Sequence, residues 1–219
     1  MTEKSNIEQR LRYRHIFGIR LSAGSIMLTV FCAFLLVLAT FIKINLTHYI
    51  IPFDIFNGEQ HCHEDFLKTV TIIPQIPMVM FIGAFLGRKY GIASILIYIL
   101  TGLFILPVFA LGGGLRYVLE YGFGYIIGYI PAIFFAGSIL KSGYTYRNIA
   151  HSMLVGVLTI HVIGVFYMLF LAGIRQEGRE FILGWIAAQS GIKILYDFII
   201  AYIAALFAKY ARLLLWIFL

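Results

Sequence analysis

The chain has 219 residues, of which 61% are hydrophobic and only 12% are charged, and its mean hydropathy is +0.92. A soluble domain cannot bury that much apolar surface, so these values exclude a soluble globular protein and predict a single-domain integral membrane protein. The net charge of +7 does not predict nucleic-acid binding, because the basic residues sort by membrane side and form no single patch. The two cysteines, Cys32 in an apolar run and Cys62 in a loop, indicate no disulfide framework.

The N-terminal part combines a basic segment with a long apolar run. Residues 1–20 are polar and basic, and we expect them to lie in the cytoplasm. The apolar run at about 21–41 is longer than the core of a cleavable signal peptide, so it predicts a retained membrane-spanning helix. Along it Ser25, Thr29 and Ala33 form a stripe of small side chains. Such a stripe allows close packing, either against another helix of this chain or against a partner protein.

The loop at 43–65 is acidic and contains the run HCHED at residues 61–65. Zinc sites usually take ligands from separated pairs at fixed spacing. The side chains here are consecutive on a loop, where neighbours tend to point apart. We therefore interpret this segment as a solvated outer loop with no metal site.

A second span is expected at about 66–87, and it is interrupted by Pro74 and Pro77 with Gln75 between them. Prolines bend a helix and remove backbone donors. Gln75 therefore either hydrogen-bonds a ligand at the bend or satisfies carbonyl groups that the prolines free. Glycines at positions 83, 87 and 91 lie four residues apart, which favours close approach of another helix.

The connection between a third span at about 91–109 and a fourth at about 122–140 is unusual. It contains three successive glycines at 112–114, followed by Arg116. Irregular backbone at membrane depth survives only where it is buried in protein or faces a watery cavity. We therefore predict that this Gly-rich loop borders a binding site. Arg116 either pairs with Glu120 or is available for the carboxylate of a ligand.

His161 and Asp197 fall well inside the last two expected spans, at about 149–173 and 191–210. His161 stands alone in an apolar helix, which more often indicates an interhelical hydrogen bond than a ligand contact. An aspartate inside a spanning helix costs about 2.5–3.5 kcal/mol on insertion scales and usually marks a binding or transport site. Asp197 therefore either accepts hydrogen bonds from a ligand or forms an i, i+4 ion pair with Lys193. In the intervening loop, at 174–189, Trp185 is expected to cap the mouth of a cavity.

The expected architecture is all-α, with six transmembrane helices and an irregular Gly-rich loop after the third. In that arrangement eleven of the 17 Lys and Arg residues lie on the side of both termini. The positive-inside rule then places both termini in the cytoplasm and the Gly-rich loop outside, in a multi-pass protein of the plasma (inner) membrane. The chain has no GxxxxGK[ST] phosphate loop, so ATP hydrolysis by that route is not expected, and we predict no enzymatic activity.

Residues 74–137 resemble the BioY family, the biotin-specific S components of energy-coupling-factor vitamin transporters. The resemblance rests on the glycines at 83, 87 and 91, then Tyr98-x-x-x-Gly102-Leu103-x-x-Leu106-Pro107-Val108-Phe109, Gly112-Gly113-Gly114 and Phe123-Gly124-Tyr125-x-x-Gly128, with a weaker match at 35–44. It implies a six-helix membrane protein that binds biotin near its outer face, without a cofactor or metal. It also implies a membrane-embedded T component and two ATPase subunits as partners.

Carried over by position, the resemblance implies that the Gly-rich loop and Asp197 contact biotin. The candidate substrate-binding residues are Gln75, Tyr98, Gly112, Gly113, Gly114, Arg116, Tyr117 and Asp197, and the candidate partner-binding residues are Ser25, Thr29 and Ala33. The sequence departs from the family in having Tyr121-Gly122 where Pro-Thr is usual. It also has Ile200 where the sixth helix usually has a lysine, for which Lys193 is a possible substitute.

Two other functions compete with biotin uptake. The first is a carrier for another vitamin-like small solute on the same scaffold, which the sixth-helix departure keeps open. The second is an intramembrane metal-dependent enzyme that would use His61, His63 and Glu64. This enzyme is disfavoured because those residues share one loop and no second cluster accompanies them.

Overall fold

The computed structural model describes residues 13–16, 19–49, 62 and 66–218. Its helices are α2 (Ala23–Phe41), α3 (Gln75–Phe104), α4 (Phe123–Leu140), α5 (Tyr146–Arg175), α6 (Arg179–Ser190) and α7 (Lys193–Phe218), with a short 3₁₀ helix, η2 (Leu115–Leu119). Two antiparallel hairpins complete it: β1 (Tyr13–Ile16) with β2 (Ile19–Ser22), and β3 (Ile44–Tyr49) with β4 (Leu67–Ile72). Among the described residues, five helical stretches are long and apolar enough to cross a membrane.

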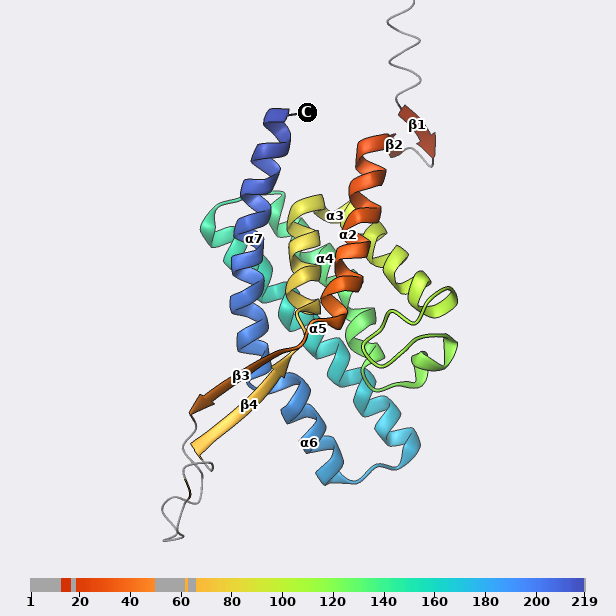
Figure 1. Cartoon of the computed structure of the whole chain (residues 1–219), viewed down its shortest axis with the longest axis vertical. Helices are drawn as coiled ribbons and strands as arrows, with labels where there is room; N and C mark the ends of the chain where they lie inside the picture. The colour runs from red at the N-terminus through yellow and green to blue at the C-terminus, as the bar shows by residue number, and fades with distance from the viewer. Residues whose placement is uncertain (1–12, 17–18, 50–61, 63–65, 219) are drawn as a thin grey trace, which may run out of the picture.

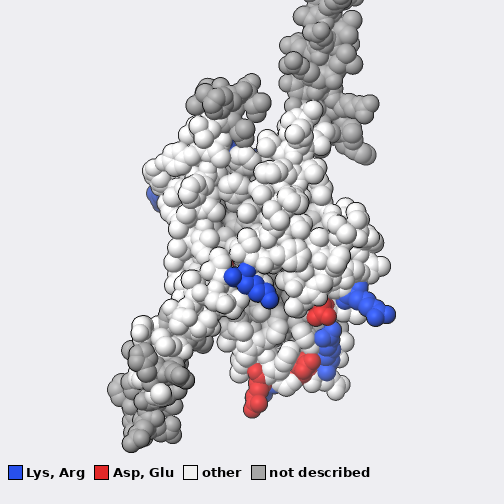
Figure 2. Space-filling model, viewed as in Figure 1, with Lys and Arg blue, Asp and Glu red and all other residues white. Residues whose placement is uncertain are grey.

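The helices form one bundle whose two ends differ (Figure 1). The start of α2 and the end of α7 lie at one end, and the β3–β4 hairpin and α6 lie at the other. The core is built where α4 packs on α5 and where α3 contacts α2, α4 and α7. Its largest fully buried side chains include Tyr98, Tyr129, Met80 and Ile133. On the face shown in Figure 2, the acidic side chains gather near α6 and η2, below a broad band without charge. Such a band suits the hydrocarbon layer of a membrane.

Helix α3 is broken at Gly87, whose backbone has φ 74° and ψ −176°. Glycine adopts this positive φ without steric cost. The two halves fold back on each other, because a Cβ added at Gly91 would lie 3.5 Å from the Cα of Gly83. The small residues therefore do allow a close approach, but between the two halves of α3 and not along one continuous helix.

Several boundaries differ from the expected spans, among them the end of α3, which is Phe104 and not residue 109. Residues 67–72, expected at the start of the second span, pair with β3 from Ile44↔Ile72 to Tyr49↔Leu67. All five residues of the run TVTII at 69–73 are β-branched, which favours a strand over a helix. Helix α3 then begins at Gln75, directly after Pro74. The segment at 179–190, expected as a loop, is the helix α6.

The Gly-rich loop after α3 is held by its backbone. Gly114 donates its N–H to the carbonyl oxygen of Gly102 at 2.8 Å, and Phe109 and Gly112 exchange two hydrogen bonds. A Cβ at Gly113 would lie 2.6 Å from Pro107 Cα and 2.7 Å from the Gly102 oxygen. Because these obstacles are backbone atoms, no rotamer change can relieve them.

We therefore expect Gly113→Ala to lower the stability of the protein by about 1–3 kcal/mol, the usual cost of overpacking. The measurement is the melting temperature of the detergent-purified protein. Gly173→Ala in α5 is the matched control, because a Cβ there meets nothing within 4 Å. Equal melting temperatures for wild type and Gly113→Ala would show that the loop is not closely packed.

Candidate functional site

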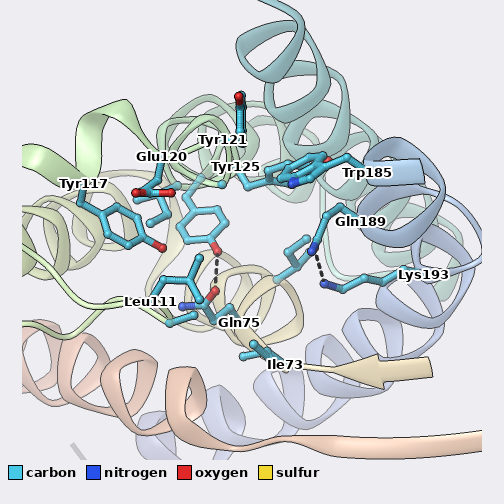
Figure 3. A pocket seen from close by; sticks show the side chains of 15 residues that line it. Ile73, Gln75, Leu111, Tyr117, Glu120, Tyr121, Tyr125, Trp185, Gln189 and Lys193 are labelled. Carbon is cyan, nitrogen blue, oxygen red and sulfur yellow. Dashed lines mark hydrogen bonds between the residues drawn. The ribbon is translucent and has the colours of Figure 1, made fainter. Parts of the chain in front are cut away.

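A cavity of about 220 Å³ lies near the α6 end of the bundle, between the start of α3, the loop after it, α4, α6 and the start of α7 (Figure 3). Sites for drug-sized ligands measure roughly 300–1,000 Å³, so this cavity suits a small solute. Its wall combines apolar and aromatic side chains with several polar groups. That combination is typical of a binding site in which a few hydrogen bonds fix the orientation of a ligand.

Aromatic side chains from three elements form one wall of the cavity. The indole of Trp185 on α6 packs against the rings of Tyr121, at 6.2 Å between centroids, and Tyr125, at 5.7 Å. Tyr117 of η2 lies against Phe109, with ring centroids 4.6 Å apart. Burial raises the pKa of the Tyr117 phenol, so it remains a neutral hydrogen-bonding group at physiological pH. These rings offer a rigid apolar surface with hydroxyl groups at its edges.

The floor of the cavity is a hydrogen-bonded cluster around Gln75, which connects three helices. Its Nε2 donates to Thr40 Oγ1 of α2 at 2.7 Å and to the Tyr98 hydroxyl at 3.0 Å. Its Oε1 accepts from the Tyr129 hydroxyl of α4 at 3.3 Å. Figure 3 shows this last bond and the Gln75 side chain pointing into the cavity. The amide therefore satisfies buried hydroxyls and not the carbonyls freed by the prolines.

Of the described residues that line the cavity, one is basic and one is acidic. Lys193, at the start of α7, donates from Nζ to Gln189 Oε1 of α6 at 3.3 Å. Glu120 lies on the opposite side, near Tyr117 (Figure 3). A cation and an acceptor on opposite sides suit a ligand with an anionic end and a donor-bearing end.

A chain of buried polar groups leads away from the cavity wall. The Tyr125 hydroxyl and Ser190 Oγ lie 2.5 Å apart, and Ser190 Oγ lies 3.0 Å from His161 Nδ1. His161 Nε2 lies 3.2 Å from Asp197 Oδ2, and both side chains are almost completely buried. Asp197 Oδ1 has no hydrogen-bond partner among the described residues. His161 is thus an interhelical hydrogen bonder, and it replaces Lys193 as the partner of Asp197.

The structure brings some of the candidate residues together and separates others. Gln75 and Tyr117 line the cavity, and Tyr98 lies fully buried beneath Gln75. Asp197 is fully buried behind the wall, and Arg116 is exposed on η2, so neither side chain lines the cavity. The loop is shaped by Gly112, Gly113 and Gly114, but the loop residues that line the cavity are Ala110 and Leu111. Among the described residues, Arg116 forms no ion pair with Glu120.

The small-residue stripe on α2 faces the interior of this chain. Thr29 and Ala33 are only 5% and 4% exposed, and α2 packs against α3. The burial of Thr29 and Ala33 favours the intramolecular alternative, whereas Ser25 is half-buried, and a partner role for Ser25, Thr29 and Ala33 stays a prediction. Close packing needed small side chains here, but the helix that they approach belongs to the same chain.

Several wall residues were not predicted. Tyr121 and Tyr125 line the cavity from the start of α4 and the segment before it. Gln189 reaches the cavity because α6 folds under the bundle, and the apolar segment with one tryptophan signalled only Trp185. Tyr125 stands in the Phe123-Gly124-Tyr125 motif, which did signal a special position. Of the HCHED run, only Cys62 is described, and the rest lies outside the described residues. Within the described part, no group of three His, Cys, Asp or Glu side chains is placed to hold a metal.

The fold defines a multi-pass helical membrane protein, with a cavity near one end of its bundle. The sequence pattern of the BioY family matches residues 64–215. The chain belongs to the BioY family.

Individual relatives agree with this assignment. The chain is 31% identical to the probable biotin transporter BioY of Lysinibacillus sphaericus over 150 residues. The aligned region covers 65% of this chain and 74% of that relative. It is 35% identical over 116 residues to the probable biotin transporter BioY of Pyrococcus horikoshii, covering 52% of this chain and 67% of that protein. Its fold is similar to the crystal structure of the S-component for biotin from an ECF-type ABC transporter, with a TM-score of 0.62. The two sequences are 21% identical, and the alignment covers 97% of this chain and 94% of the S-component chain.

Proposed function

We propose that this chain is the membrane subunit that binds biotin for uptake. The proposal rests on the cavity, found in a chain of the BioY family. The cavity has an aromatic wall, the amide of Gln75 on its floor and Lys193 at its edge. Biotin has an apolar fused ring and chain, a ureido group with two N–H donors and one carbonyl, and a carboxylate. Buried polar groups of a ligand need partners, and the cavity offers one type of partner for each of these groups.

Within this proposal the candidate residues take different roles. Gln75 and Tyr117 contact the ligand, and Lys193 meets its carboxylate in place of Arg116. Tyr98 and Asp197 act from behind the wall, through Gln75 and through the His161–Ser190–Tyr125 chain. The three glycines and Arg116 belong to the loop that closes the cavity. This division follows from which side chains line the cavity and which are buried or exposed.

The deciding experiment is equilibrium binding of biotin and of biotin amide to the purified protein. We expect saturable biotin binding that Lys193→Gln weakens about tenfold, the usual loss for a hydrogen bond to a charged group, while the amide is affected far less. Arg116→Gln is the control, because it removes the same charge outside the cavity. No saturable binding of biotin, together with binding of another small vitamin, would favour the alternative carrier.

We further propose six membrane crossings, with both termini in the cytoplasm of a cell whose plasma membrane holds the protein. The two halves of α3, at 75–86 and 88–104, run in opposite directions in Figure 1, which supports two crossings in place of one. The basic residues near Gly87, between α4 and α5 and at the end of α7 support the orientation by the positive-inside rule. Energy for uptake would come from a T component and two ATPases, as the likeness to an S-component suggests.

The orientation can be tested with the chain's own cysteines. We expect an impermeant thiol reagent to label Cys62 in intact cells, because Cys62 is exposed near the β3–β4 hairpin, whereas Cys32 is buried in α2. In a Cys62→Ser background, Ser142→Cys, exposed between α4 and α5, should react only after the cells are opened. Labelling of Ser142→Cys in intact cells, with protection of Cys62, would reverse the orientation.

A further inference from the structure

A second, larger cavity lies beside the break in α3, away from the aromatic site. It measures about 480 Å³, and four of its lining residues are basic: Arg88, Lys89, Lys141 and Arg212. They come from three segments: the break in α3, the turn after α4, and the last turns of α7. None of the described residues that line the cavity is acidic. A concave site with this composition has the chemistry to bind an anion.

Two of the four cations are held in place by the fold. Arg212 donates from Nη1 to the carbonyl oxygen of Ala84 at 3.2 Å and to the Tyr144 hydroxyl, and its guanidinium lies 4.8 Å from the centre of the Tyr144 ring. Tyr144 donates to the same carbonyl at 2.8 Å. This carbonyl lies three residues before Gly87, so the break in α3 is what makes it available to Arg212. Among the described contacts Arg212 uses only Nη1, so Nη2 and Nε remain for a ligand.

Arg88 is fixed in a similar way on the other side of the break. Its guanidinium lies 4.8 Å from the centre of the Phe134 ring, and its Nη1 donates to Ser138 Oγ at 3.4 Å. Lys89 and Lys141 are exposed at the mouth of the cavity. Two fixed arginines with two exposed lysines beside them suit a phosphate group, because arginine binds phosphate through a fork of donors and lysine binds it as a point charge.

The charge distribution leaves these cations without a compensating acid in the described chain. The described acidic residues are Glu120, Glu177, Glu180 and Asp197, which belong to the aromatic site, to the α6 end or to the His161 pair. In Figure 2 the visible acidic side chains lie at the α6 end only. The positive-inside rule explains why basic residues lie on this side of the membrane. It does not explain why they converge on one cavity.

We propose that this cavity binds the phosphodiester headgroup of an anionic phospholipid. Leu86 and Leu140 line it together with the cations, so it offers apolar contact beside the charges. It is formed at the ends of apolar helices, where headgroups are found, and basic pockets between membrane helices are known to bind such lipids. A free phosphate would gain the charges but not the apolar contact.

The test is lipid binding to the purified protein by native mass spectrometry, with phosphatidylglycerol, cardiolipin and phosphatidylcholine. We expect retention of both anionic lipids and little retention of phosphatidylcholine. The double variant Lys89→Gln/Lys141→Gln should weaken anionic lipid binding by about tenfold to thirtyfold, because each basic residue near the surface contributes about 1 kcal/mol. The control variant Lys43→Gln/Arg116→Gln removes the same charge from exposed positions away from the cavity and should bind lipid like wild type.

Four outcomes would overturn the proposal. The first is that both double variants weaken binding of anionic lipid equally, and the second is that phosphatidylcholine is retained as well as the anionic lipids. The third is that inorganic phosphate displaces the lipid at a concentration similar to that of the lipid. The fourth is that Lys89→Gln/Lys141→Gln loses a protein partner but still binds lipid. The third would identify a free phosphate as the ligand, and the fourth a protein contact. Biotin binding and the melting temperature, measured in parallel, establish that the variants are folded.

Discussion

Replacing His161 with alanine is expected to cost about 3–5 kcal/mol of stability, the range for leaving a buried acidic group without its partner. His161 and Asp197 are 2% and 0% exposed, and their nearest polar atoms are 3.2 Å apart. Without the imidazole, Asp197 would keep a buried carboxylate that has no other hydrogen bond among the described residues. Thermal or denaturant unfolding in detergent measures the loss. His151→Ala, at an exposed position of the same helix, is the control and should change little.

Two milder variants separate stability from ligand binding at the same pair. Asp197→Asn keeps the shape and can still hydrogen-bond His161, so it should destabilise less than His161→Ala. It should weaken biotin binding by about 1.5–3 kcal/mol if the carboxylate acts on the site through the buried chain. Ser190→Ala interrupts that chain between His161 and Tyr125 without leaving a buried charge. If Ser190→Ala and Asp197→Asn leave biotin affinity unchanged, the chain is purely structural and does not support the binding site.

The parts of the fold that could be predicted are those fixed by hydrophobicity and by glycine. Long apolar runs specify membrane helices, since the chain must satisfy its backbone groups internally in lipid. The irregular loop could be predicted from three consecutive glycines, and its contacts explain them: a Cβ at Gly113 would collide with Pro107 and with the Gly102 carbonyl. The separation of the second and third spans near residues 87–91 was also predicted, and the structure places the break at Gly87, with a positive φ.

The parts that could not be predicted depend on which residues meet in space. Periodicity relates Lys193 to Asp197 on one helix, but it cannot show that His161 of α5 lies 3.2 Å from that aspartate. It also cannot show that α6 brings Gln189 to the cavity. Arg116 looked suitable as an anion donor because of its neighbours in sequence, yet η2 leaves it exposed and outside the cavity. Contacts between helices are set by packing of the whole bundle, which one sequence does not record residue by residue.

Gln75→Leu should damage both stability and biotin binding, because Gln75 is at once a link between helices and part of the cavity floor. The only hydrogen bond of the Tyr129 hydroxyl among the described residues is to Gln75 Oε1. In the leucine variant this buried hydroxyl loses its partner, at a cost of about 1–3 kcal/mol. Thr40 is less affected, since its hydroxyl also donates to the Leu36 carbonyl at 2.9 Å.

The double variant Gln75→Leu/Tyr129→Phe removes the unpaired hydroxyl together with the amide. We expect it to recover most of the lost stability, because replacing both partners of a hydrogen bond by apolar groups is often nearly neutral. It should not recover biotin affinity if the Gln75 amide contacts the ureido group, so unfolding and biotin titration of the four proteins in the cycle separate the two roles. Tyr129→Phe alone is the matched control and should bind biotin within about threefold of wild type, since it leaves Gln75 in place. If the double variant regains both stability and full affinity, Gln75 only holds the helices together and the ligand makes its polar contacts elsewhere in the cavity.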